Sequence, residues 1–161
     1  MCLYKGRNEM QIASEDIICY KLIQIYHRSE GDDYRTYFQH TKIELNEPII
    51  AERYLTIQGL NEREYLYGEV VHAFCDFYCD DSDIDWYIED TRSCPYFEEC
   101  NVSIAKVECI IPKGTMFCEG VDEDENPCYG ALEIIPKRIV KTVYSYEILN
   151  SQTQRPASRT C

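Results

Sequence analysis

The sequence predicts an α+β fold, a single domain in which a mixed or antiparallel sheet carries one or two short helices. The length of 161 residues suits one domain with its own core. β-Branched and aromatic segments recur between turn signals along most of the chain, and one acidic stretch with helix-capping residues interrupts them. We expect the domain to cover residues 1–149. Residues 150–161 are polar and predict a disordered tail.

The first third of the chain is typical of strands. Residues 17–26 are β-branched and aromatic, and they predict a strand. A turn signal at 29–33 follows, after which residues 34–45 alternate well enough for one or two strands. Residues 49–57 suit two structures, because Pro48 fits the first turn of a helix while the isoleucines fit a strand. Both interpretations remain open at this point.

The remainder of the chain predicts a central strand, one helix and a closing set of strands. The compact apolar run over residues 68–77 predicts a strand in the middle of the sheet. Acidic residues and a serine at 80–83 supply N-cap chemistry for a short helix over 84–91. Further strands are predicted over residues 102–111, 116–118, 130–140 and 143–149.

The net charge of −13 is concentrated in one part of the chain. Residues 76–125 contain 15 acidic against 3 basic side chains, which gives −12, and the rest contains 14 against 13, which gives −1. Nucleic acid and anionic membranes are therefore poor partners for this segment. A basic protein surface or a cation is a better one.

Aromatic side chains alternate with these acids, which is typical of a protein-binding surface. Carboxylates steer a basic partner and bind arginine in bidentate fashion, and a dense row of them imitates the charge of duplex DNA. The alternative is an ordinary solvated face. The predicted partner-binding residues are Asp76, Asp80, Asp81, Asp83, Asp85, Trp86, Tyr87, Glu89, Asp90, Glu98, Glu99, Asp122, Glu123, Asp124 and Glu125.

Ten cysteines invite a disulfide interpretation, but no apolar leader follows the N-terminal methionine. We therefore expect reduced thiols and a cytoplasmic protein, with Cys19 and Cys109 acting as small hydrophobic residues in strands. Zinc is an alternative, because thiolate and imidazole are its usual ligands. The candidate ligands are His72, Cys75, Cys79, Cys94 and Cys100. In a strand, His72 and Cys75 have opposite parity, which favours structural cysteines over a zinc site.

Several segments together resemble a family of small proteins, without assigned activity, from phages and mobile elements of gut Bacteroidales. They are Met1-Cys2-Leu3, Asp16 to Lys21, Gly68 to Phe74 and Lys106 to Thr115. The resemblance implies a phage or mobile-element protein in the cytoplasm of a bacterial host. Together with the acidic segment, it suggests a non-enzymatic inhibitor of a basic, nucleic-acid-binding host protein. Defence effectors, including CRISPR effectors, are the target class we expect, so that the protein would be anti-CRISPR-like.

The order of strands also resembles a reduced ADP-ribosyltransferase core, which is the rival, enzymatic hypothesis. The resemblance implies nucleotide-site roles for Tyr20, His72 and Glu133, with Ala73 standing where a serine is expected. A zinc-stabilised structural module is a third alternative.

Overall fold

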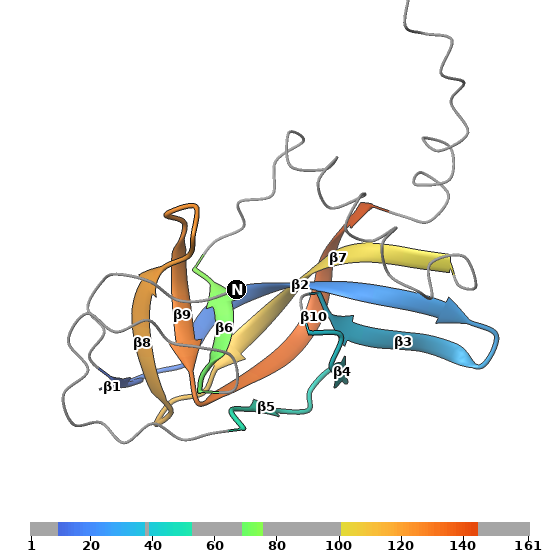
Figure 1. Ribbon diagram of the computed structural model, residues 1–161. Helices are drawn as coiled ribbons and strands as arrows, with labels where there is room; N and C mark the ends of the chain where they lie inside the picture. The colour runs from blue at the N-terminus through green and yellow to red at the C-terminus, as the bar shows by residue number, and fades with distance from the viewer. Residues whose placement is uncertain (1–9, 38, 53–68, 76–100, 145–161) are drawn as a thin grey trace, which may run out of the picture.

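The computed structural model describes residues 10–37, 39–52, 69–75 and 101–144, and these form ten strands (Figure 1). In chain order the strands are β1 (Gln11–Ile12), β2 (Ile17–Arg28), β3 (Gly31–Thr36), β4 (Lys42–Ile43), β5 (Ile49–Ile50), β6 (Val71–Phe74), β7 (Asn101–Ile111), β8 (Met116–Val121), β9 (Pro127–Ala131) and β10 (Glu133–Tyr144).

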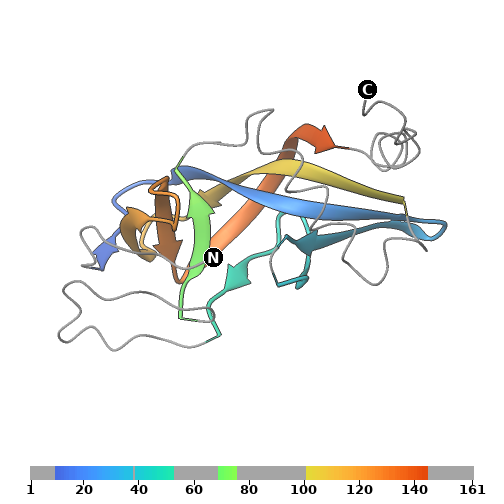
Figure 2. The same ribbon diagram turned by 45° about the horizontal axis from the view of Figure 1, so that its top comes forward.

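All of these strands belong to one sheet, with the order β1-β8-β9-β6-β2-β7-β10-β5, and β3 and β4 extend it beside β2. Every pairing is antiparallel. The long strands β2, β7 and β10 cross the middle of the molecule, while β8, β9 and β6 turn away at one end (Figures 1 and 2). The sheet is thus strongly twisted and partly wraps around its own core.

The core lies on one face of the β2–β7 ladder. Alternate residues Cys19, Ile23 and Ile25 of β2 share this face with Val107 and Cys109 of β7, because directly paired residues of antiparallel strands point to the same side. β-Branched residues dominate both strands, which favours this extended conformation. Part of the other face is also buried, including Leu22, Gln24 and Tyr26 of β2.

The α+β prediction is wrong for the part of the chain that the structure describes. Those residues contain no helix, and the isoleucines of the ambiguous run 49–57 begin it as strand β5. Pro48 does not open a helix because the next two residues pair with the start of β10. The helix predicted over 84–91 and the tail predicted over 150–161 lie outside the described residues.

Most predicted strands are confirmed, and the closing pair is corrected. Residues 17–26 and 102–111 form β2 and β7, and the central strand is the shorter β6, between β9 and β2. The last break falls at Leu132 rather than near residue 141, so β10 runs unbroken past Pro136. A bulge follows this proline, which explains how the strand accommodates a residue without an N–H.

The described ranges also contain no helix of the length and apolar character that a bilayer crossing requires.

Candidate functional site

An acidic loop, residues 122–126, joins β8 to β9 and contains four of the predicted partner-binding residues. The buried carboxylate of Asp122 holds the loop together from inside. Its Oδ1 accepts the N–H groups of Asp124 at 3.0 Å and Asn126 at 2.8 Å, and its Oδ2 accepts Asn126 Nδ2 at 3.1 Å. Glu123, Asp124 and Glu125 are exposed around this closed turn. Three carboxylates are therefore presented to solvent, and the fourth is structural.

Removal of the internal carboxylate should loosen this loop. We expect Asp122→Ala to lower the free energy of unfolding by about 1 to 2 kcal/mol, because the variant leaves backbone donors of the turn without their acceptor. Urea unfolding of the variant beside Asp124→Ala, whose side chain is exposed, measures this difference. Equal stability of the two variants would contradict the structural role of Asp122.

The acidic loop lies where the chain enters the longer acidic segment. The N–H of Cys75 donates to the carbonyl of Pro127 at 3.1 Å, one residue after the loop. Asp76, the first acid of the segment, follows Cys75 directly in sequence. The residue that precedes the acidic segment in sequence is therefore held beside the end of the acidic loop.

The other predicted partner-binding residues lie outside the described residues, so their arrangement stays a prediction. They are Asp76, Asp80, Asp81, Asp83, Asp85, Trp86, Tyr87, Glu89, Asp90, Glu98 and Glu99.

A second candidate site is a cavity of about 110 Å³ beside the middle of β2, called here the Lys21 cavity. On one edge, β2 pairs with β7 along its length, but on the other it pairs with β6 only at Tyr20 and with β3 only from Ile23 onward. The cavity opens at the change of partner, and Lys21 and Leu22 line it. β4 and β5 lie between β6 and β3 in both ribbon views (Figures 1 and 2).

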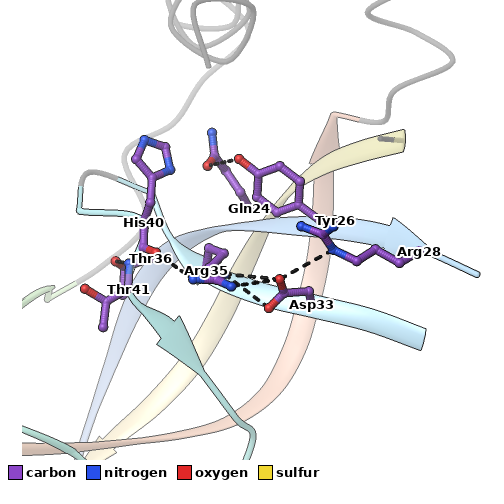
Figure 3. A network of polar contacts seen from close by, with 8 residues as sticks. All are labelled: Gln24, Tyr26, Arg28, Asp33, Arg35, Thr36, His40 and Thr41. Atoms are coloured by element: carbon purple, nitrogen blue, oxygen red, sulfur yellow. Dashed lines mark hydrogen bonds and ion pairs between the residues drawn. The ribbon is translucent and has the colours of Figure 1, made fainter. Parts of the chain in front are cut away.

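One wall of the Lys21 cavity is fixed by a polar network in the β3–β4 hairpin (Figure 3). The guanidinium of Arg35 contacts Asp33 at 3.0 Å and also donates to the carbonyl of His40 at 3.3 Å. Thr36 and Thr41 exchange two hydrogen bonds, from Thr36 N to the Thr41 carbonyl and from Thr41 N to Thr36 Oγ1. Both threonines line the cavity, and the bond from Thr41 N holds the hydroxyl group of Thr36 in place.

Lys21 is the one lysine or arginine of the described cavity wall, which also contains Glu52 and His72. Its amine donates to the backbone carbonyl of His72, which bridges β2 and β6 where their ladder ends. Burial lowers the pKa of Lys21, and interactions with Cys109, Cys19 and Cys128 oppose this shift only in part. Within the described ranges no carboxylate forms an ion pair with this amine. The site thus combines a desolvated amine with an adjoining space.

The residues implied by the ADP-ribosyltransferase resemblance are only partly brought together. Tyr20 and His72 both line the Lys21 cavity. Glu133 is not among the described lining residues. It pairs with Ile50, which does line the cavity. The nucleotide-site roles therefore stay a prediction.

The predicted zinc ligands are mostly beyond the described part of the chain. Cys79, Cys94 and Cys100 lie outside it, and within it no group of three or more His, Cys, Asp or Glu side chains is placed to hold a metal ion. His72 is buried in β6, and Cys75 follows the strand. Cys19 and Cys109 are fully buried, as the sequence predicted.

Sequence reasoning missed Lys21, although a signal was present. Cys19, Lys21, Ile23 and Ile25 occupy alternate positions of one strand, so the lysine is in phase with residues of the apolar face. A lysine at such a position is either buried or lines an opening, and both are unusual. The opening itself has no sequence signal, because it depends on where β2 changes partner.

Comparison of the chain with protein-family models, with curated proteins and with solved structures finds no match.

Proposed function

We propose that this protein binds a basic protein partner through its acidic residues and catalyses no reaction in doing so. The partner we favour is a nucleic-acid-binding protein of a bacterial host, with defence effectors such as CRISPR effectors as the leading class. The acidic residues would occupy the groove in which that partner holds nucleic acid.

The observation that carries this proposal is the hydrogen bond from Cys75 to Pro127. It holds Cys75, the residue directly before the acidic segment, beside the end of the acidic loop, which supports the proposal that the two runs of carboxylates act together. The loop adds three exposed carboxylates on a turn that Asp122 braces internally. Because a braced backbone loses less conformational entropy on binding, such a loop suits recognition of arginine-rich surfaces.

The test uses variants in which amides replace carboxylates, so that the charge changes while the size of each side chain is kept. In the loop variant, Glu123→Gln, Asp124→Asn and Glu125→Gln are combined, and Asp122 is kept because it is structural. The segment variant combines Asp80→Asn, Asp81→Asn and Asp83→Asn. A matched control, Glu15→Gln with Glu44→Gln and Glu47→Gln, removes the same charge from exposed acids elsewhere.

Binding is measured against the heparin-binding fraction of a bacterial lysate and, for each protein recovered, against that protein after purification. We expect the loop and segment variants each to weaken binding by about three- to tenfold and to reduce its salt dependence, while the control changes little. Duplex DNA should compete with the unmodified protein. Equal losses of binding in all three variants would show that only the net charge matters and would contradict the proposal.

A further inference from the structure

The Lys21 cavity has the size of a small organic molecule. Its volume is about 110 Å³, somewhat less than the roughly 150 Å³ of an engineered apolar cavity that binds benzene. Apolar groups of Leu22, Ile49, Val71 and Phe74 form much of the described wall. A ligand for this space is therefore compact, largely apolar and smaller than a nucleotide.

Among the polar groups of the cavity wall, the amine of Lys21 favours nucleophilic chemistry. Lys21 uses one N–H in its contact with the His72 carbonyl, and no described carboxylate pairs with it to stabilise its charged form. An amine in such surroundings is uncharged more often than an exposed one, and its lone pair makes it a nucleophile. Burial lowers the pKa of Lys21, in agreement with this geometry.

A hydroxyl group on the neighbouring strand β3 complements the amine, since Thr36 pairs with Ile23, two residues along β2 from Lys21. Thr36 Oγ1 accepts the N–H of Thr41, which leaves the hydroxyl proton of Thr36 unused by any described residue. Thr36 and Thr41 line the same cavity as Lys21. A hydroxyl donor facing a carbonyl oxygen stabilises the charge that develops there when an amine attacks the carbonyl carbon.

We propose that Lys21 captures small aldehydes or ketones in this cavity as reversible imines. The nitrogen lone pair of Lys21 forms a bond to the carbonyl carbon, and the electron pair of the C=O bond moves to oxygen. The resulting carbinolamine then loses that oxygen as water, which takes both protons of the amine as the C=N bond forms. No oxidant or reductant is required, and the activity is independent of the acidic residues proposed to bind a partner.

The test is competitive labelling of the full-length protein, in which its own exposed lysines serve as internal controls. The protein is incubated near neutral pH with propanal, benzaldehyde or naphthaldehyde, and sodium cyanoborohydride reduces any imine to a stable amine. Peptide mass spectrometry then gives the labelling rate at each lysine. We expect propanal to label Lys21 roughly tenfold faster than exposed Lys42 and Lys113, since more of its amine is uncharged.

The size series and denaturation separate a cavity from general reactivity. Labelling of Lys21 should fall from propanal to naphthaldehyde, and its advantage should vanish in urea. Thr36→Val should slow the reaction at Lys21 while leaving that at Lys113 unchanged. Labelling that is equal at all lysines, or that follows solvent exposure alone, would overturn the proposal. Because the comparison between lysines is made within the unmodified protein, it does not require a variant of Lys21 that folds.

Discussion

Raising the pH from about 8 to about 10 is expected to destabilise this protein by several kcal/mol, because its core contains thiols that ionise only after unfolding. Cys19, Cys109, Cys118 and Cys128 are each almost completely buried. Burial raises the pKa of Cys109, Cys118 and Cys128 from an ordinary 9.0 to about 12. It also raises the pKa of Cys19.

The sign of the effect follows from where each state holds its protons. Below pH 9 the thiols are protonated in both states, so their contribution to stability is complete. Above pH 9 the unfolded chain releases protons that the folded protein retains, which costs about 1.4 kcal/mol per pH unit for each thiol. Four thiols thus remove roughly 5 kcal/mol by pH 10, which equals the whole stability of many small domains.

Two other groups also make the stability of the protein depend on pH in the alkaline range. The pKa of Lys21 is lowered, so its burial becomes less costly as the pH rises toward the ordinary value of 10.5, which opposes the loss in part. The pKa of Tyr129 is raised to about 12, which adds to the loss above pH 10. One lysine against four thiols leaves the net effect destabilising.

Urea unfolding at a series of pH values, with a reductant present, measures this loss. Cys109→Ala should lower stability at pH 7 through lost packing, yet its stability should fall less steeply above pH 9. Val107→Ala is the matched control, because it truncates a neighbouring buried side chain that does not ionise. Parallel curves for the two variants would show that the thiols do not cause the alkaline loss.

The long strands β2 and β7 were predictable because each carries a local pattern. β2 and β7 are long β-branched runs, and the turn after β7 has a glycine, Gly114, at a positive φ of 87°. The α+β class is wrong for the described residues, because the run 49–57, a helix candidate on account of Pro48, begins as strand β5, and every other described element is also a strand of the antiparallel sheet. Local patterns locate single elements, but they do not determine the helix and strand content of the described chain.

The candidate sites were predictable only where they depend on composition. The exposed acids of the loop were recognised from the sequence, but the structural role of Asp122 was not, because its carboxylate bonds to backbone groups that any residue offers. The Lys21 cavity was missed for a different reason. It exists because β6 and β3 pair with separate parts of β2, and this long-range register has no local signature.

The second large effect is expected from a substitution, Gly130→Ala, which destabilises the protein through overpacking. Gly130 lies in β9 between His72 of β6 and Cys118 of β8. A Cβ at this position would stand 2.8 Å from Val70 Cγ2 and 3.1 Å from Cys118 Sγ. Valine has few rotamers, so it cannot move aside cheaply, and we expect a loss of about 2 kcal/mol in the free energy of unfolding.

A double-mutant cycle with Val70→Ala tests the cause of that loss. The second substitution removes the methyl group that the new Cβ would meet, so the double variant should be more stable than the sum of the single losses predicts, by about 1 kcal/mol. Gly114→Ala is the control, because it has open space and a strained φ instead of a clash, and Val70→Ala should not rescue it. The same variants also test the contact between Lys21 and β6. A β6 displaced by the clash moves the His72 carbonyl away from the Lys21 amine, so Gly130→Ala should alter aldehyde labelling at Lys21, and the double variant should restore it.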